Sequence, residues 1–248
     1  MYDSLAAYYH LIFENWDASI ERQARVLGAL LESVCPARPL KILDAACGIG
    51  TQALGLAMRG HRVSGSDVSA PAIARARLEA AARHVSIPVH LADMRDLRAV
   101  PGGPFDALLI ADNALAHLDT DDDLCRMARS AARQLAPGGV LLASLRDYDK
   151  LVAERPTAQG PAFYSDHGRR RIVHQIWDWT AERRYTVHLY ISVETDVGWD
   201  CHHFTSVMHA WGRSAINAAV EDAGFQNVRW IEPAGGYYQP IVLARARQ

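Results

Sequence analysis

Short apolar runs alternate with helical segments through the middle of the chain, and this alternation constrains the fold more than any other feature. The expected strands cover residues 40–43, 62–66, 88–91, 105–111 and 140–145. Segments with helical periodicity lie between them, at residues 51–59, 70–84 and 121–135. Strands that alternate with helices are typical of a doubly wound parallel sheet, which two last strands, 228–231 and 241–244, should complete.

The segments that flank this alternation predict two additions to the sheet. Residues 20–31 carry apolar side chains at helical spacing and form a cap ahead of the first strand. Residues 171–179, 185–194 and 202–211 are rich in β-branched and aromatic residues, which indicates an antiparallel sheet, and a helix over 213–223 follows. We therefore expect one domain over residues 1–248. It divides into a cap or lid at 1–38, a core at 39–146 and 213–248, and an antiparallel insert at 147–212.

The composition narrows the class of partner. Half of the 248 residues are hydrophobic, and 26 basic against 28 acidic side chains give a formal net charge of −2. Without a sustained basic run, this balance argues against a nucleic-acid or anionic-membrane partner. We expect a cytoplasmic protein, because the N-terminus lacks signal-peptide features and no apolar stretch approaches the roughly 20 residues that span a bilayer. Four scattered cysteines without a C-x-x-C pair indicate reduced thiols.

The strongest local signal for a ligand site is LDAACGIGT at residues 43–51, a strand that runs into a Gly-x-Gly turn and opens a helix. Gly48 and Gly50 let a ligand approach backbone that a Cβ would cover. Taken alone, this spacing also fits a dinucleotide site or a merely tight turn. Asp67 lies 19 residues after Gly48 at the end of the next strand, where an acid accepts hydrogen bonds from a ribose diol. Both classes of nucleotide cofactor are compatible with these residues.

Asp93, Met94 and Asp44 separate the two classes. Asp93 and Met94 end the third strand, where an acid can take an adenine amine and a methionine can cover the ring face. Asp44 stands just before the glycine turn, and no third glycine follows that turn. A dinucleotide has no need of Asp44 there, whereas a cofactor with an amino-acid tail and no pyrophosphate does. The residues therefore favour a cofactor of the second kind.

With these residues, the chain resembles the class I S-adenosylmethionine (SAM) methyltransferases over nearly its whole length. The matching segments follow the family's order, through residues 44–51, 105–106 and 137–139 to the closing strands. The resemblance implies a Rossmann-like α/β fold with a seven-stranded sheet whose last strand is antiparallel. It also implies SAM as cofactor and S-adenosylhomocysteine as product. The cofactor-binding residues that it implies are Asp44, Ala46, Gly48, Gly50, Asp67, Val68, Asp93, Met94, Ala111 and His117.

Two segments, residues 112–118 and 146–149, are similar to the glycine and sarcosine N-methyltransferases. In those enzymes the matched asparagine and arginine face the acceptor, which places Asn113 and Arg146 in the acceptor pocket as catalytic residues. A guanidinium at the carboxyl end of a central strand independently suits a carboxylate or a carbonyl edge. Two alternatives stay open, namely that Arg146 pairs with Asp149 or another local acid at the surface, and that His117 has no ligand role.

Aromatic side chains gather in two other regions. Tyr2, Tyr9 and Trp16 belong to an N-terminal segment that folds over SAM in the family, so we expect all three in the acceptor pocket unless they only pack the cap. Tyr9 is also predicted to be catalytic, because its hydroxyl can accept a hydrogen bond from an attacking N–H. Trp177 belongs to a region with more aromatic residues than a two-carbon amino acid needs, so we also expect Trp177 in the acceptor pocket, where a flat acceptor could stack on these rings. Residues 13–16 and 177–179 are similar to the azapteridine N-methyltransferase of toxoflavin biosynthesis.

The sequence thus predicts an enzyme of secondary metabolism that moves the SAM methyl group to a nitrogen of a small molecule by in-line displacement. Glycine, sarcosine and a planar N-heterocycle are the candidate acceptors. The alternatives are an O- or S-methyltransferase, an NAD-dependent oxidoreductase and a non-catalytic SAM-binding protein. We expect no metal, because consecutive strand residues such as His202 and His203 point to opposite faces and do not easily share one ion. The oligomeric state is left open.

Overall fold

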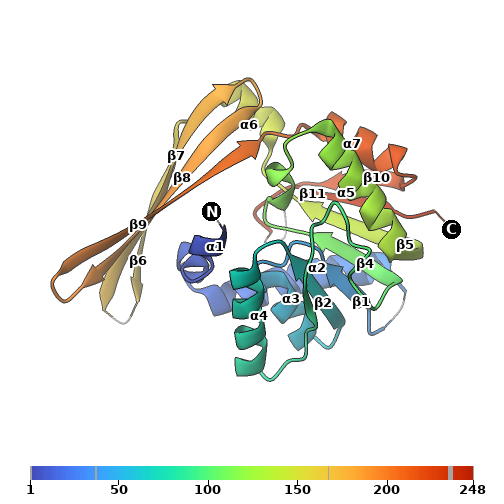
Figure 1. Cartoon of the computed structure of the whole chain (residues 1–248), viewed down its shortest axis with the longest axis horizontal. Helices are drawn as coiled ribbons and strands as arrows, with labels where there is room; N and C mark the ends of the chain where they lie inside the picture. The colour runs from blue at the N-terminus through green and yellow to red at the C-terminus, as the bar shows by residue number, and fades with distance from the viewer. Residues whose placement is uncertain (1, 37, 167, 234–236, 248) are drawn as a thin grey trace.

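A seven-stranded sheet forms the centre of the computed structural model, which describes residues 2–36, 38–166, 168–233 and 237–247, apart from the side chain of Tyr2 (Figure 1). Its order is β10-β11-β5-β4-β1-β2-β3. Strands β1 to β5 are parallel, whereas β11 runs antiparallel to both β5 and β10. This confirms the predicted Rossmann-like sheet. The strands are β1 (Lys41–Asp44), β2 (Arg62–Asp67), β3 (Val89–Leu91), β4 (Phe105–Ile110), β5 (Leu135–Ser144), β10 (Gln226–Ile231) and β11 (Ile241–Arg245).

Helices cover both faces of this sheet. Helices α2 (Trp16–Val34), α3 (Thr51–Met58) and α4 (Ala70–Ala82) supply buried side chains to the core on one face. Helices α5 (Asp121–Gln134) and α7 (Arg213–Asp222) do so on the other. Helix α2 begins four residues earlier than predicted, because the Asn15 side chain accepts a hydrogen bond from the Ala18 amide at 2.9 Å and caps it there.

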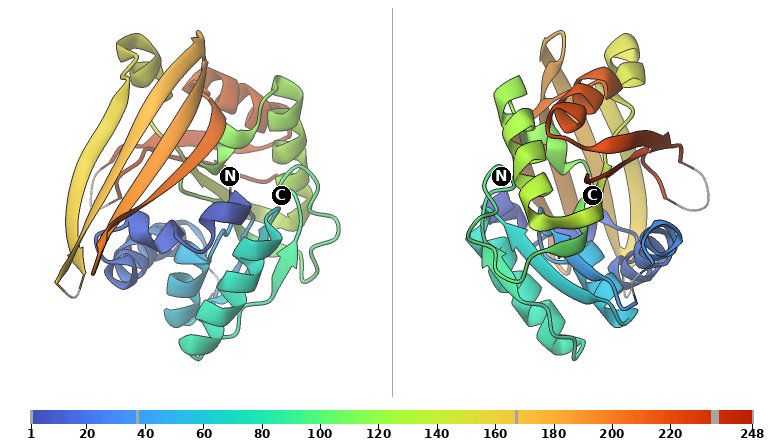
Figure 2. Two further views of the ribbon diagram at one scale, coloured as in Figure 1. Left: turned by 60° about the vertical axis from the view of Figure 1, so that its left-hand side comes forward. Right: turned by 90° about the vertical axis from the view of Figure 1, so that its right-hand side faces the viewer.

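A four-stranded antiparallel sheet stands beside the central sheet (Figures 1 and 2). Its strands, in spatial order, are β6 (Ala158–Asp166), β7 (Arg169–Ala181), β8 (Arg184–Thr195) and β9 (Gly198–His209). The last three were predicted, whereas β6 and the preceding helix α6 (Tyr148–Glu154) were not. Strand β6 is an edge strand that Gly160 and Pro161 interrupt. Proline cannot donate to a strand ladder, so a strand that contains it shows a weak sequence pattern.

The N-terminal segment lies between the two sheets (Figure 2). It comprises α1 (Tyr2–Leu5) and the 3-10 helix η1 (Tyr9–Ile12). Leu5 packs with Val173, Leu189 and other apolar side chains on the inner face of the antiparallel sheet. Residues 2–15 thus lie against the antiparallel sheet, whereas α2 packs on the central sheet. No helix among the described residues combines the length and apolar character needed to cross a membrane.

Candidate functional site

The glycine turn after β1 has two glycines with different roles. Gly48 has a φ of +52°, and a Cβ built on it would have no atom within 4 Å, so this backbone borders open space. Gly50 has a φ of +100° and caps α3, and its Cβ would lie 3.1 Å from the Leu54 Cγ. Because side chains rarely adopt either conformation, both positions favour glycine. Only Gly48 leaves room for a ligand.

Asp67 closes the other side of this space at the end of β2. Its Oδ2 accepts a hydrogen bond from the Gly48 amide, and its Oδ1 accepts one from the Ser69 amide, both at 2.9 Å. Burial raises the pKa of the Asp67 carboxyl. Each oxygen keeps a further lone pair, so the carboxylate can still accept hydrogen bonds from a ligand hydroxyl.

Asp67 and Gly48 border a cavity of about 270 Å³, which we call the cofactor cavity. His117, from the 3-10 helix η2 (Ala114–His117), also lines it, and burial lowers the pKa of this histidine to about 4, so its ring is neutral at pH 7. Seven of the ten predicted cofactor residues line this cavity. They are Ala46, Gly48, Asp67, Val68, Met94, Ala111 and His117.

The other three predicted cofactor residues lie elsewhere. Gly50 shapes the turn, and Asp44 is fully buried at the end of β1. Asp93 does not belong to the cavity lining, because Arg95 binds its carboxylate with N–O distances of 2.6 and 3.0 Å. In this structure the Asp93 carboxylate pairs with Arg95 and does not face the cavity in which an adenine amine would lie.

A second cavity of about 600 Å³, which we call the acceptor cavity, is lined by the N-terminal segment, the antiparallel sheet and the ends of β4 and β5. Asn113 and Arg146, which follow β4 and β5, both line this cavity, as predicted. Two further groups of residues line it that sequence reasoning did not find. They are Gln159, Gln175 and Tyr185 from the antiparallel sheet, and Arg22, Asp112 and Tyr238 from other elements.

Arg146 is held by neutral partners. Its Nη1 donates to the Gln159 Oε1 at 2.9 Å, its Nη2 donates to the Gln175 Oε1 at 3.3 Å, and its guanidinium lies 4.5 Å from the centre of the Trp177 ring. Among the described residues it has no carboxylate partner, and Asp149 faces Arg183 instead. The alternative of an Arg146–Asp149 pair is therefore wrong. The guanidinium keeps its charge available to an anionic ligand.

Asn113 belongs to a buried hydrogen-bond network. Its Oδ1 accepts from the Arg146 amide at 3.1 Å, and its Nδ2 donates to the Tyr148 hydroxyl at 2.8 Å. That hydroxyl lies 2.9 Å from the Tyr185 hydroxyl, and burial raises the pKa of both tyrosines, so they remain protonated. Asn113 thus positions Arg146 and Tyr148, which leaves one amide N–H for an acceptor.

Two of the predicted aromatic residues, Trp16 and Trp177, lie elsewhere than expected. Trp16 does not line either cavity, because it packs in the core beside α3 and donates from Nε1 to the Thr51 hydroxyl at 2.9 Å. Trp177 lies behind Arg146, which covers its ring, and is buried in the core. The prediction that these two tryptophans line the acceptor pocket is therefore corrected. The side chain of Tyr2 lies outside the described residues.

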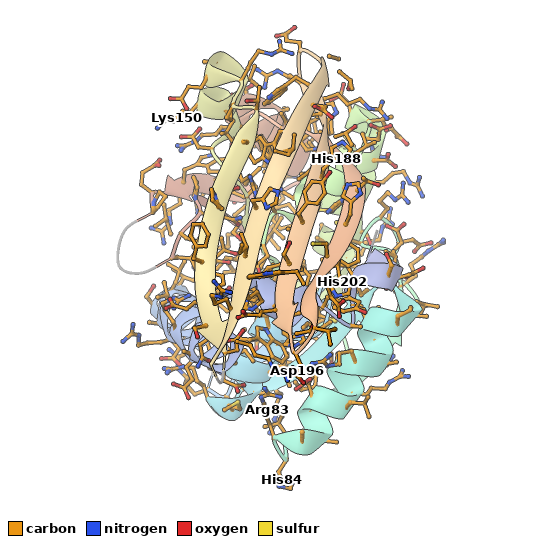
Figure 3. All side chains as sticks on the ribbon, turned by 90° about the vertical axis from the view of Figure 1, so that its left-hand side faces the viewer. Arg83, His84, Lys150, His188, Asp196 and His202 are labelled. Atoms are coloured by element: carbon orange, nitrogen blue, oxygen red, sulfur yellow. The ribbon has the colours of Figure 1, made fainter. Side chains whose placement is uncertain are left out.

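The adjacent histidines His202 and His203 point to opposite faces of the antiparallel sheet. His202 packs against Tyr8 of the N-terminal segment, with 4.0 Å between ring centres. His203 pairs instead with His188 on the outer face of the sheet, where Figure 3 labels His188. Within the described ranges, no group of three or more His, Cys, Asp or Glu side chains could hold a metal ion.

Comparisons with known sequences place the chain among methyltransferases. A family model described as a methyltransferase domain matches residues 42–139. The chain is 30% identical over 192 residues to a dTDP-4-amino-2,3,4,6-tetradeoxy-D-glucose N,N-dimethyltransferase of Saccharopolyspora spinosa, which covers 75% of this chain and 71% of the relative. It is 30% identical over 145 residues to a glycine/sarcosine N-methyltransferase of Parasynechococcus marenigrum, which covers 56% of this chain and 50% of that protein.

Solved structures show the same fold. Streptomyces venezuelae DesVI superposes with a TM-score of 0.84 at 20% identity and covers 98% of both chains. SAM-bound CalS10, an amino pentose methyltransferase from Micromonospora echinaspora, has a TM-score of 0.74 at 21% identity and covers 92% of this chain and 91% of its own. These likenesses include the antiparallel sheet, since they cover nearly the whole chain.

Proposed function

Because the chain belongs to the class I SAM-dependent methyltransferases, we propose that it transfers a methyl group to a nitrogen atom of a small molecule. SAM is the cofactor of this family. The observation that carries the proposal is the pair of adjoining cavities, one lined by the glycine turn and Asp67, the other by Arg146 and Asn113. The family sets aside the alternative of an NAD-dependent oxidoreductase.

The cofactor cavity fits SAM on observations independent of the family. Gly48 borders open space that a Cβ would enter, and Asp67 keeps acceptor capacity beside it. Ala46 and Gly48 would hold the methionine tail, Asp67 the ribose, and Met94 with Val68 the adenine. When bound, SAM supplies a methyl group already activated on a sulfonium. The protein then has to align the acceptor and exclude water, effects that contribute roughly 7 to 11 kcal/mol in favourable cases.

The acceptor cavity favours a molecule larger than an amino acid. Its volume of about 600 Å³ lies within the range of drug-sized ligands. Arg146 and Arg22 both line it, and neither has a carboxylate partner among the described residues. Guanidinium groups suit phosphate oxygens, and two of them in one cavity offer two such partners. Together with the dTDP-amino-sugar N,N-dimethyltransferases among the relatives, this supports an amino sugar carried on a nucleoside diphosphate as acceptor.

Glycine or sarcosine is the second candidate acceptor. Arg146 has the free charge that a carboxylate requires, and two relatives are glycine/sarcosine N-methyltransferases. A planar N-heterocycle has less support, because neither Trp177 nor Trp179 belongs to the cavity lining, which removes the expected stacking platform.

The test is the formation of S-adenosylhomocysteine from SAM with a panel of acceptors. The panel holds a dTDP-linked 4-amino sugar, glycine, sarcosine and a demethylated azapteridine. We expect turnover with the amino sugar and a methylated amine in the product by mass spectrometry. Turnover with an oxygen or sulfur acceptor only, while all amines stay unchanged, would contradict N-methylation.

Arg146→Ala tests whether this arginine binds the acceptor. We expect the acceptor KM to rise by about 10- to 100-fold, as for the loss of a charged hydrogen-bond pair, while the SAM Kd stays within a factor of about three. Arg183→Ala is the control, because this arginine faces Asp149 and does not line either cavity. Equal losses of SAM and acceptor affinity would mean that Arg146 only supports the fold.

A further inference from the structure

Tyr9 and Asp112 line both the cofactor cavity and the acceptor cavity. In-line methyl transfer brings the acceptor nitrogen and the methyl carbon together at this boundary, so a side chain here lies beside the reacting atoms. We propose that the Asp112 carboxylate accepts a proton from an acceptor that arrives as an alkylammonium ion. This inference rests on the proposed function and deepens it, because it names basic alkylamines as the substrate class.

The Asp112 carboxylate is held in a defined orientation. The Gln52 Nε2 donates to its Oδ2 at 2.7 Å, and the Tyr238 hydroxyl donates to its Oδ1. The Asp112 backbone amide donates to the Ser144 hydroxyl at 2.9 Å. The Tyr237 hydroxyl is a third side-chain donor to this carboxylate. Two carboxylate oxygens offer about four lone-pair sites, so acceptor capacity remains for a ligand.

The backbone at Asp112 is also unusual. Its φ is +54°, and that of the following Asn113 is +69°. Residues other than glycine rarely adopt this left-handed conformation, and such positions cluster at active sites because the surrounding structure must hold them there. The turn directs residue 112 to the boundary between the cavities.

Asp112 forms no ion pair with a cationic side chain in the part of the chain that the structure describes. Its side-chain donors are the Gln52 amide and the phenols of Tyr238 and Tyr237. Tyr9 lines the same boundary, the neutral His117 lines the cofactor cavity, and the Asp44 carboxyl interacts with Asp112 as a like charge. The guanidinium groups of Arg22 and Arg146 line the acceptor cavity with Asp112 but form no ion pair with it. Burial raises the pKa of the Asp112 carboxyl, which makes it a stronger base than an exposed aspartate. An ammonium ion would supply a cationic partner.

Tyr9 is the weaker candidate for this role. A phenol has an ordinary pKa near 10, so at neutral pH it donates or accepts a hydrogen bond but does not take up a proton. A carboxylate can do so when a neighbouring ammonium and a raised pKa reduce the difference in proton affinity. Tyr9 therefore lines the boundary between the cavities without accepting the proton, and Asp112 serves as the base.

Proton transfer from the ammonium to Asp112 comes first, and methyl transfer to the freed nitrogen lone pair follows. One N–H bond of the ammonium breaks, its proton moves to an Asp112 oxygen, and the electron pair stays on nitrogen. That pair forms the new N–C bond while the electrons of the C–S bond stay on sulfur, which gives a neutral thioether and a methylated ammonium. The proton leaves Asp112 for solvent when the products depart. A ring nitrogen of low pKa arrives unprotonated and has no need of this step.

The test compares Asp112→Asn with the wild-type enzyme, using the dTDP-linked amino sugar as acceptor. Asparagine tolerates the left-handed backbone and keeps the volume, so the variant removes the charge with little other change. We expect kcat/KM at pH 7 to fall by about 100-fold. The residual activity should rise with pH in proportion to the neutral amine, whereas the wild-type profile should flatten at lower pH. Asp122→Asn, at an exposed helix start, is the control.

A second measurement does not depend on activity. The Kd of the amino sugar and that of its hydroxyl counterpart are determined in the presence of S-adenosylhomocysteine. Wild-type protein should prefer the amine by about 10-fold, as expected for a charged hydrogen bond, and Asp112→Asn should bind both equally. Tyr238→Phe removes a donor that lowers the pKa of Asp112, so the acidic limb of its kcat/KM profile should move to higher pH.

The outcomes separate this inference from the proposed function. Wild-type enzyme that binds SAM but methylates no amine overturns both. Amine turnover in the wild type with an unchanged pH profile and amine preference in Asp112→Asn overturns only the role of Asp112. A loss of SAM affinity in Asp112→Asn that accounts for the whole loss of rate would assign the acid to the cofactor site and also overturn the inference.

Discussion

Asp44 shows how strongly burial acts on a single residue of this site. Its side chain has no exposed surface, and neither carboxylate oxygen has a hydrogen-bond partner at ordinary geometry among the described residues. Burial raises its pKa to about 7, the charges of Asp112 and Asp67 act in the same direction, and the nearby amides of Ala46 and Ala53 oppose them. A carboxyl in this setting is protonated in part at neutral pH.

This predicts a pH dependence of stability without SAM. Because the folded state binds the Asp44 proton more tightly than the unfolded state, whose pKa lies near 3.8, the contribution of Asp44 falls as the pH rises towards 7. Asp44→Asn should remove that fall. Between pH 5 and pH 8, the free energy of unfolding should therefore decrease by at least about 1 kcal/mol more in the wild type than in the variant. Urea unfolding at both pH values measures it. Parallel behaviour of wild type and variant would contradict the raised pKa, and the exposed Asp200→Asn is the control.

At the scale of elements, Arg171 of β7 connects the antiparallel sheet to the N-terminal segment. Its side chain is buried, its Nε donates to the Asp166 Oδ2 at 2.7 Å, and its Nη atoms donate to the carbonyls of Leu11, Phe13 and Glu14. Three carbonyls of one segment therefore share one guanidinium. This contact holds residues 9–15 over the acceptor cavity.

Arg171→Ala should loosen this segment. The variant removes the hydrogen bonds that Arg171 donates to three partly exposed carbonyls, each worth about 0.5 to 1.5 kcal/mol, so the segment should open more often. Hydrogen exchange by mass spectrometry should show faster exchange in a peptide over residues 9–15 and little change in α5. The acceptor KM should rise in parallel. Equal acceleration of exchange in all peptides would mean that Arg171 stabilises the whole fold rather than this segment. Arg170→Ala, whose exposed side chain pairs with Glu194, is the control.

At the scale of the whole molecule, the two sheets share one hydrophobic core. Trp177, Tyr185 and Met208 of the antiparallel sheet belong to the same buried cluster as Leu108 and Leu141 of the central sheet. A core that crosses from one sheet to the other favours cooperative unfolding, because neither part can expose its share alone. The N-terminal segment and both cavities lie between these parts.

SAM should therefore stabilise the molecule as one unit. At a SAM concentration of 100 Kd, linkage predicts about 2.7 kcal/mol of stabilisation, or roughly 5 to 10 °C in the melting temperature of a chain of this size. Differential scanning fluorimetry should show a single transition that moves upward with SAM and with S-adenosylhomocysteine, but not with NAD. A shift with NAD alone would contradict the proposed cofactor, and two separate transitions would contradict the shared core.

The central sheet and most of the cofactor cavity could be predicted from the sequence. Strand and helix periodicities are local, and the carboxyl ends of parallel strands meet at one edge, so Gly48 and Asp67 had to lie close together. Asp93 departs from this pattern, because Arg95 folds back onto it after the strand. A local ion pair of this kind depends on the turn that follows β3, which the periodicity of the strand does not describe.

The acceptor cavity depended on tertiary structure. Trp177 and Tyr185 both lie in the antiparallel sheet, yet Arg146 covers the ring of Trp177 while Tyr185 lines the cavity. Asp112 reaches the boundary of the two cavities only through a left-handed turn and the packing of Gln52 and Tyr238 around it. Local spacing in the chain was enough to predict the sheet, the glycine turn and the family resemblance. Only long-range packing decided which side chains face the acceptor, because that depends on neighbours distant in the chain.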